Sequence, residues 1–244
     1  FRGIFNGTTN YILTKMSDEG SEFAVALKEA QDCGYAEFDP SDDIDGMDTA
    51  YKVVLSSCKG FGVFTSVHDI DIYGIRSISA RDIAYACTHD YVCKLIGTGI
   101  KSNDSVSATV IPTFIPKENL FATIPANFNA IESDSRTLGK MTYVGQGAGS
   151  YPTAHAVVQD LIDLVYKQDI VVALEVGVRV DNMSRVSSFY VRSINLDNIQ
   201  GLIEERIDED TCITKKISFV QLSSLIEKLA DDAVFVAEVM HDCK

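Results

Sequence analysis

Apolar side chains recur at helical spacing in two stretches of the first third of the chain. Over residues 46–59 they follow one another at intervals of three and four positions, at Met47, Ala50, Tyr51, Val54, Leu55 and Cys58. This pattern predicts a helix that buries one continuous stripe. Residues 21–33 have the same spacing and are followed by Gly34, which favours a left-handed helix stop, so they predict the first helix of the chain.

Three later stretches also predict helices. Ser79 and Asp82 have the spacing of a capping box for a helix that reaches about His89. A helix that opens near Pro152 carries apolar residues on one side, at Val157, Val158, Leu161, Ile162 and Val165. Near the end of the chain, residues 222–229 predict one more helix.

Alternating or continuous apolar runs predict β-strands at residues 92–97, 105–111, 140–144 and 189–194. Pro112, Pro116 and Pro125 follow the second of these runs, and we expect loops there because proline cannot donate a hydrogen bond to a sheet. After about Ser187 the chain changes character, which predicts a small appended α+β module.

Composition narrows the class of protein. The 244 residues are 46% hydrophobic and 23% charged, which is typical of a soluble globular protein of one or two domains. There are 21 Lys plus Arg against 35 Asp plus Glu, and the net charge of -14 argues against nucleic acid as a partner. No apolar run approaches the roughly 20 residues of a membrane span. We therefore expect a soluble, cytoplasmic protein without membrane contact, and the motif-like start at Phe1 leads us to expect further sequence upstream.

The six cysteines, at positions 33, 58, 87, 93, 212 and 243, lie mostly far apart, which favours free thiols over a disulfide framework. Cys87, His89 and Cys93 allow a zinc interpretation, but they include no Cys-x-x-Cys pair and have no clear fourth ligand. The favoured interpretation is that these cysteines belong to the core or the surface, and no metal is expected.

An acidic segment over residues 37–48 places six carboxylates in 12 residues, at Glu37, Asp39, Asp42, Asp43, Asp45 and Asp48. A calcium loop with Gly46 at its invariant glycine fails, because Lys52 then takes the place of the bidentate glutamate. Two interpretations remain, a solvated acidic turn or a pocket for a substrate ammonium group. Asp48 and Lys52 share one helix face, either as an ordinary surface ion pair or as a lysine held at that pocket.

A glycine-rich turn, Gly145-Gln-Gly-Ala-Gly-Ser150, joins the strand predicted at 140–144 to the helix near Pro152. Such turns bring backbone N–H groups close to a pyrophosphate at a helix N-terminus. The third glycine comes one residue early for the dinucleotide fingerprint, and no convincing series of βαβ units follows. The sequence favours a tight turn that only touches a cofactor bound mainly elsewhere.

Four blocks of the sequence, in their order and spacing, resemble homoserine dehydrogenases. They are Asn6-Gly-Thr-Thr-Asn-Tyr-Ile-Leu-Thr14, Ala30-Gln-Asp-Cys-Gly-Tyr-Ala-Glu-Phe-Asp-Pro40, Asp42-Asp-Ile-Asp-Gly-Met-Asp-Thr-Ala50 with Lys52, and Gly145-Gln-Gly-Ala-Gly149 before Pro152-Thr-Ala. The resemblance runs from Phe1 to about Lys167. It implies an NAD(P)-dependent oxidoreductase that interconverts L-homoserine and L-aspartate 4-semialdehyde, on the route from aspartate to threonine and methionine.

The resemblance also implies roles for single residues. Lys52 matches the family's catalytic lysine, which manages the proton on the substrate oxygen while hydride moves to or from the nicotinamide. Asp48 matches the carboxylate that positions or charge-stabilises this lysine. The remaining matches are the substrate-binding residues Glu37 and Asp43, the turn residues Gly7 and Thr8 near substrate and nicotinamide, and the cofactor-facing Gly149.

The fold that the resemblance implies is α+β, a mixed and largely antiparallel sheet covered on one side by helices. Residues 1–185 would form the catalytic and dimerisation domain of a homodimer. Residues 186–244 would form an abbreviated ACT-like regulatory domain, because 195–206 lacks the usual Asp-x-Pro-Gly turn and helix. The family's N-terminal Rossmann domain, which holds most of the NAD or NADP contacts, has no counterpart in the sequence. The alternative function is an amino-acid-binding regulatory protein without catalysis.

Overall fold

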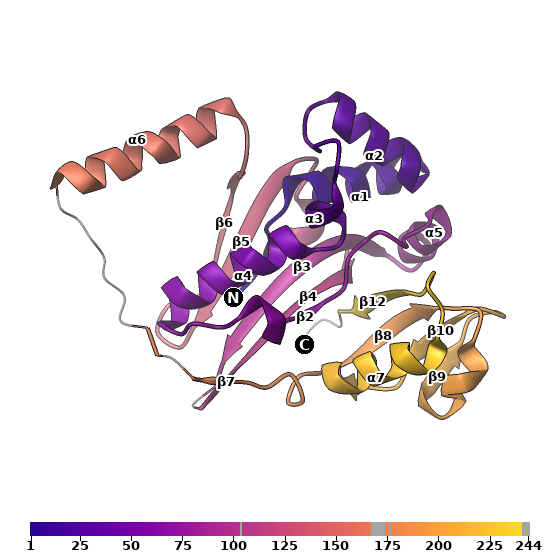
Figure 1. The fold of residues 1–244 in the computed structure, drawn as a ribbon. Coiled ribbons are helices and arrows are strands. Elements are labelled where there is room, and N and C mark those ends of the chain that lie inside the picture. The colour runs from indigo at the N-terminus through magenta and orange to yellow at the C-terminus, as the bar shows by residue number, and fades with distance from the viewer. Residues whose placement is uncertain (103, 167–173, 176, 241–244) are drawn as a thin grey trace.

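A sheet of 12 strands forms the centre of the protein, seen in a computed structural model that describes residues 1–102, 104–166, 174–175 and 177–240 (Figure 1). Along the sheet the strands are β6 (Gly139–Gln146), β5 (Phe128–Ser135), β1 (Arg2–Ile4), β3 (Tyr91–Lys101), β4 (Ser105–Pro116), β12 (Phe235–Val239), β8 (Val186–Arg192), β10 (Thr211–Thr214) and β9 (Ile203–Arg206). Short strands β2 (Asp71–Ile72) and β7 (Arg179–Val180) pair with β4, and β11 (Ile217–Ser218) pairs with β8. Most pairs are antiparallel and three of those with β4 are parallel, so the mixed α+β fold is confirmed.

Seven α-helices lie among the described residues: α1 (Gly7–Glu19), α2 (Phe23–Asp32), α3 (Ser41–Ile44), α4 (Met47–Phe61), α5 (Ala80–Thr88), α6 (Ser150–Tyr166) and α7 (Phe219–Leu229). Three 3-10 helices complete the elements: η1 (Val67–Asp69), η2 (Leu120–Thr123) and η3 (Leu196–Leu202). Successive side chains of a strand point to opposite faces of the sheet. Leu95 of β3 packs with residues of α1, α4 and α5 on one face, whereas Ile96 packs with η2 on the other. The first four long helices therefore cover one face of the sheet (Figure 1).

Helix α4 forms where predicted but buries a different face. Its buried residues are Thr49, Ala50, Val53 and Ser57, whereas Tyr51 and Leu55 of the predicted stripe are 47% and 63% exposed. The reason is Gly97 of β3, where a Cβ would lie only 2.6 Å from Val53 Cγ2 and 3.0 Å from Thr49 Cγ2. The missing side chain lets α4 approach the strand through its small and β-branched residues. The prediction of one continuous apolar stripe was wrong.

Strand β4 runs through Pro112 and Pro116, where loops were predicted. Pro112 lies opposite Leu95 of β3, in the register gap between β2, which pairs with Val110, and β12, which pairs with Thr113. A proline interrupts the hydrogen bonds of a continuous neighbour, but here the neighbouring strands change at that position. The strand therefore extends past the proline to its end at Pro116.

Helix α1 precedes the stretch that was predicted to be the first helix. Its opening sequence, Gly7-Thr-Thr-Asn10, consists of weak helix formers, which explains why the pattern did not reveal it. The side chain of Asn6 caps it, and Gly20 ends it in the left-handed conformation. The helices predicted at 21–33, from Ser79, near Pro152 and at 222–229 are present, and Ser79 and Asp82 form the predicted capping box.

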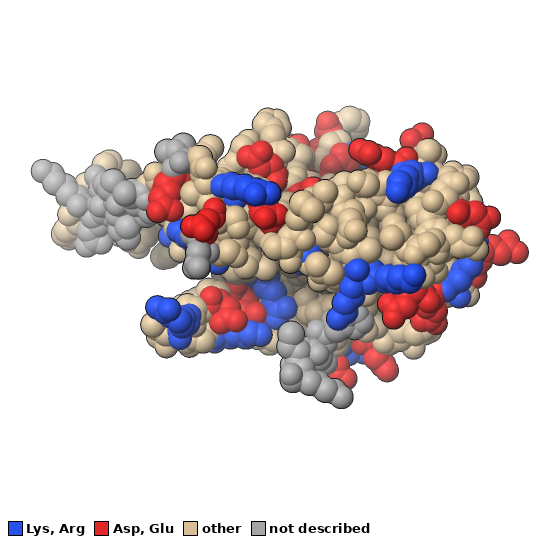
Figure 2. Space-filling model, turned by 90° about the horizontal axis from the view of Figure 1, so that it is seen from below, with Lys and Arg blue, Asp and Glu red and all other residues tan. Residues whose placement is uncertain are grey.

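The C-terminal part continues the same sheet. Strand β12 pairs in parallel with β4, and Asp82 of α5 accepts hydrogen bonds from Tyr190 Oη at 2.9 Å and Arg192 Nε at 2.8 Å. Asn195–Arg206 contains the 3-10 helix η3 and strand β9 in place of an α-helix. The boundary between residues 185 and 186 stays a prediction. On the face seen in Figure 2, basic side chains lie among acidic ones.

Other features concern the cysteines and possible metal or membrane contacts. Cys33, Cys58, Cys87, Cys93 and Cys212 are free thiols, and Cys243 lies outside the described residues. Within the described part of the chain, no three His, Cys, Asp or Glu side chains are placed to hold a metal ion. Among those same residues, no helix has the length and apolar character needed to span a membrane.

Candidate functional site

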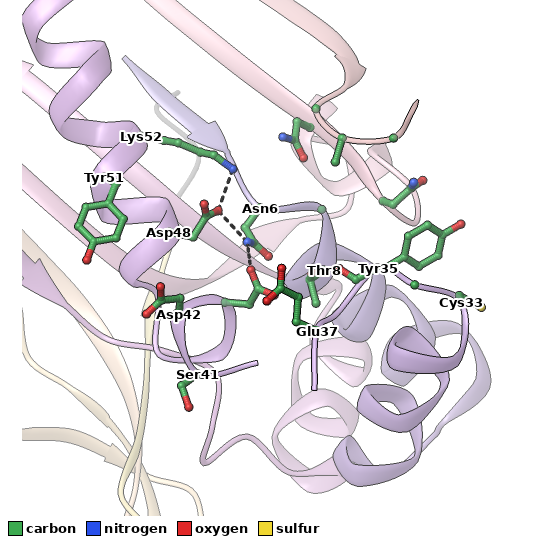
Figure 3. A pocket seen from close by; sticks show the side chains of 18 of the residues that line it. Asn6, Thr8, Cys33, Tyr35, Glu37, Ser41, Asp42, Asp48, Tyr51 and Lys52 are labelled. Carbon is green, nitrogen blue, oxygen red and sulfur yellow. Dashed lines mark hydrogen bonds and ion pairs between the residues drawn. The ribbon is translucent and has the colours of Figure 1, made fainter. Parts of the chain in front are cut away.

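The acidic segment faces a cavity of about 750 Å³ between the start of α1, the chain from Cys33 to Asp43, helix α4 and the glycine loop after β6 (Figure 3). All seven residues singled out in the sequence line this one cavity: Gly7, Thr8, Glu37, Asp43, Asp48, Lys52 and Gly149. They come from positions up to 142 residues apart, the separation of Gly7 and Gly149. The structure therefore brings the candidate residues together, while their roles stay predictions.

The turn into α1 forms one wall. A Cβ on Gly7 would lie 2.8 Å from the carbonyl oxygen of Asn127, so only glycine fits without displacing that backbone. The hydroxyl of Thr8 donates to the carbonyl oxygen of Tyr35 at 2.7 Å. These two contacts hold the helix start between the loop that precedes β5 and the acidic segment.

The acidic segment is held in a fixed shape by hydrogen bonds. Ser41 N donates to Asp39 at 3.1 Å, and the side-chain and backbone hydrogen bonds from Ser41 lower the pKa of Asp39. Arg76 forms a two-armed ion pair with Asp45, with both N···O distances 2.7 Å. Gly46 then turns the chain from α3 into α4 with a φ of 88°. These contacts give the segment a defined shape, and Glu37, Asp39 and Asp42 within it are exposed.

Lys52 and Asp48 form the ion pair at the centre of the pocket. Lys52 Nζ donates to Asp48 Oδ2 at 2.7 Å (Figure 3). It also donates to the carbonyl oxygen of Phe5 at 2.8 Å. Of the three N–H bonds of the ammonium, two thus have partners among the described residues and one is left for a ligand. The side chains are 39% and 31% exposed, so the pair contributes little to stability, about 0.5 kcal/mol.

Asp43 is one of the partly buried carboxylates of the group. Burial raises its pKa above the ordinary value, and the hydrogen bond from Asn6 partly offsets that rise. The charge of Asp48 adds to the rise, and that of Lys52 opposes it. Lys52 is the single cation among the described residues that line the cavity, so the surplus of carboxylates favours a cationic ligand.

The pocket also contains side-chain amides that were not predicted from the sequence. The amide of Asn6 donates to both Asp43 and Asp48, and that of Asn129 donates to the Phe5 carbonyl oxygen at 3.1 Å. Asn127 also lines the cavity. Asn6 could have been identified from the sequence, because it is a helix-capping residue directly before Gly7 in the first of the four family-like blocks. Nothing near Asn129 in the sequence marks it, because its partner Phe5 lies 124 residues away.

The glycine loop forms the uncharged end of the pocket. A Cβ on Gly147 would overlap the amide nitrogen of Asn129 at 1.9 Å, and Gly149 has a φ of 117°. The backbone at Gly149 thus favours glycine, and a side chain at Gly147 would have to displace the side chain of Asn129. This end of the cavity, lined by Gly147, Ala148 and Gly149, therefore carries no charged side chain among the described residues.

The chain matches the family model described as homoserine dehydrogenase over residues 1–162. It is 42% identical over 167 residues to a homoserine dehydrogenase of Synechocystis sp., a match that covers 67% of this chain and 39% of that protein. The matching segment thus spans about two fifths of this curated relative.

Two solved structures are also similar. A homoserine dehydrogenase from Thiobacillus denitrificans has a TM-score of 0.81 at 29% identity, with 98% of this chain and 63% of that chain covered. A hyperthermophilic archaeal homoserine dehydrogenase mutant in complex with NADPH has a TM-score of 0.56 at 29% identity. That match covers 68% of this chain and 47% of the archaeal one. The bacterial match therefore extends over nearly the whole chain, and the archaeal one over about two thirds of it.

Proposed function

The chain belongs to the homoserine dehydrogenase family, and from that premise we propose that its pocket binds L-homoserine or L-aspartate 4-semialdehyde for hydride exchange with NAD or NADP. The observation that carries the proposal is the position of Lys52, a single ammonium fixed by Asp48 and the Phe5 carbonyl in an otherwise acidic pocket. Such a site suits an amino-acid substrate, whose own ammonium group needs carboxylates and whose reacting oxygen needs a proton donor or acceptor.

Substrate binding is assigned to the two ends of the acidic segment. Glu37 and Asp43 would accept hydrogen bonds from the substrate ammonium group. Gly7 and Thr8 would contact the substrate and the nicotinamide from the opposite wall, where the glycine allows a close approach of the backbone. These contacts would set the reacting carbon near Lys52.

Lys52 would handle the proton of the reaction. When homoserine is oxidised, the hydroxyl oxygen loses a proton and the carbon that carries it loses a hydride. The nicotinamide, when bound, accepts that hydride or returns it. Lys52 Nζ would accept the proton in its neutral form and donate it back to the aldehyde oxygen in reverse. Asp48 orients the nitrogen and stabilises its positive charge.

The cofactor would touch this chain at Gly149 and be bound mainly outside the described residues, which contain no series of βαβ units. Helix α6 follows Gly149 and has no buried residue; Val157, Leu161 and Val165 are 54%, 56% and 76% exposed. An apolar helix face of this kind supports packing against a nucleotide-binding unit or a second copy of the chain. A homodimer remains our expectation.

The C-terminal part is proposed to be an ACT-like module. Apart from the two-residue strand β11, its elements run β8, η3, β9, β10, α7 and β12, which follows the βαββαβ order with a 3-10 helix in the first helical place. The alternative, an amino-acid-binding protein without catalysis, would assign the function to this module alone. The convergence of seven predicted residues on one pocket in the other part favours catalysis.

A chimera tests the proposal. The segment of this chain that matches the Synechocystis relative replaces the corresponding segment of that protein, and homoserine-dependent formation of reduced nicotinamide is measured. We expect turnover, and we expect Lys52→Ala to lower it by about 100- to 10,000-fold. Lys59→Ala, an exposed lysine on the same helix, is the matched control.

Unaltered turnover in the Lys52→Ala chimera would refute the assignment of the site. The purified 244-residue chain is expected to give no turnover alone, because most cofactor contacts would lie outside it. Turnover by the chain alone would refute that part of the proposal.

A further inference from the structure

We propose that Asn6 is a positioning residue of this site: its side-chain amide holds the carboxylates of Asp43 and Asp48 side by side and so fixes Asp48 against Lys52. The inference rests on the function proposed above and adds a residue to it. Asn6 is 5% exposed and lies where β1 gives way to α1, facing the start of α4 (Figure 3).

The geometry uses every polar atom of the side chain. Asn6 Nδ2 donates to Asp43 Oδ1 at 2.6 Å and to Asp48 Oδ2 at 2.8 Å. Asn6 Oδ1 accepts from the backbone N–H of Thr9 at 2.8 Å, which caps α1. The cap fixes which way the amide points, because the flipped amide would present its oxygen to two carboxylates. The amide oxygen of Asn6 thus caps α1, and its amide nitrogen bridges the two carboxylates of the pocket.

The bridge matters because two like charges share one donor nitrogen. Carboxylates at such close range repel each other, and one of them takes up a proton more readily unless donors lie between them. Asp48 Oδ2 also accepts from Lys52 Nζ at 2.7 Å, so the nitrogen of Asn6 and that of Lys52 fix the same oxygen. Without the amide, Asp48 would lose one of its two fixed partners, and Asp43 would lose its hydrogen bond to Asn6 at 2.6 Å.

Other titratable groups face the same space. The charged ones are Glu37 and Asp39 before α3, Asp42 on α3 and Lys52 on α4. Cys33, Tyr35 and Tyr51 are the neutral ones. From α1, β5 and the glycine loop, the described lining residues bring no charge. Asn6 is therefore the neutral donor placed among an excess of acceptors, and Lys52 is the charged one.

The two ends of Asn6 can be tested separately. Asn6→Ser keeps a good capping oxygen but removes the amide. Its thermal midpoint should stay close to that of the unaltered chain, while the pKa of Asp43, followed by carboxyl-carbon NMR in the 244-residue chain, should rise further. Asn127→Ser makes the same chemical change in the same pocket, at a residue with no hydrogen bond to either carboxylate, and should leave the Asp43 titration unchanged.

An identical Asp43 titration in Asn6→Ser and in the unaltered chain would overturn the inference. So would an equal rise in Asn127→Ser, because the effect would then not depend on the bridge. If the upward shift in Asn6→Ser becomes smaller when Asp48→Asn is added, the repulsion between the two carboxylates is its source. A shift of the same size with and without Asp48 would contradict a bridging role.

Kinetics of the chimera separate this inference from the proposed function. Asn6→Ser should lower kcat/KM about tenfold and move the acid limb of its pH profile upward. A residue that only caps the helix would lower stability without moving the profile. If Lys52→Ala removes turnover and the pH profile of Asn6→Ser does not move, only the role of Asn6 fails. If Lys52→Ala remains active, the proposed function fails first.

Discussion

Two lysines on neighbouring elements have opposite surroundings. Lys52 lines the pocket, is 39% exposed and has a carboxylate partner in Asp48. Lys94 of β3 is 2% exposed, and its ammonium donates only to neutral acceptors, at 2.7 Å to Asn10, 2.8 Å to the Ile124 carbonyl and 3.3 Å to Thr14. The first faces the cavity, where a ligand can reach it, and the second is sealed inside the protein.

The difference between the two lysines distinguishes a residue of the ligand cavity from a residue of the buried core. Burial lowers the pKa of Lys94 to about 8, with a small opposing effect from Cys93 and Asp18. Its three hydrogen bonds tie α1 to the chain that leads from η2 toward Asn127 and Asn129. Lys94 therefore supports two walls of the pocket without reaching it, whereas Lys52 touches the ligand space and contributes little to stability.

The largest expected effect on stability is that of Lys94→Ala. The change leaves the buried side-chain oxygen of Asn10 without a donor, removes the shorter of two hydrogen bonds to the Ile124 carbonyl and opens a cavity, so the free energy of unfolding should fall by about 3 kcal/mol. Denaturant unfolding measures it. Lys101→Ala, at the exposed end of the same strand, should change stability by less than about 0.5 kcal/mol. A loss below about 1 kcal/mol for Lys94→Ala would contradict the structural role.

The second effect is a pH dependence of stability. Between a folded pKa of about 8 and the ordinary lysine value of 10.5, the unfolded chain holds a proton on Lys94 that the folded chain has released. Stability should therefore rise with pH across this window, by up to about 1.4 kcal/mol per pH unit from this residue.

Lys94→Met isolates this contribution, because the tyrosines also titrate in the same range. The slope of unfolding free energy against pH should be smaller in the variant than in the unaltered chain. Equal slopes would mean that Lys94 holds its proton as readily in the folded chain as in the unfolded one.

The smallest effect belongs to the exposed pair. Asp48→Asn should change the free energy of unfolding by less than about 0.5 kcal/mol, because the ion pair with Lys52 is partly solvated. In the chimera the same variant should lower turnover, since Lys52 loses its orienting partner. A stability loss as large as that of Lys94→Ala would place Asp48 among the structural groups and remove the contrast between the two lysines.

The sequence predicted the features that depend on residues close together in the chain. The capping box at Ser79, the helix that follows the glycine loop and the position of α4 were all visible in the spacing of residues. The buried face of α4 was not, because it depends on the missing side chain of Gly97 in a strand 48 residues beyond Thr49. Strand β4 likewise runs through Pro112 only because its neighbouring strands change there.

The residues of the site likewise fall into those that the sequence could predict and those that it could not. The acidic segment, Lys52 and the glycine loop carry their chemistry in short stretches and were predicted to act together. Asn129, the Phe5 carbonyl and Lys94 reach their partners only through the sheet, across 124, 47 and 84 residues. No spacing along the chain marks such groups, so they could be identified only from the folded structure.

The most direct measurement of the central claim is an NMR titration of the 244-residue chain with L-homoserine, following side-chain carboxyl and lysine signals. We expect the signals of Glu37, Asp43 and Lys52 to shift together while that of Lys94 does not. Saturating homoserine that leaves these three signals unmoved, or that shifts only residues of the C-terminal part, would contradict the assignment of the pocket.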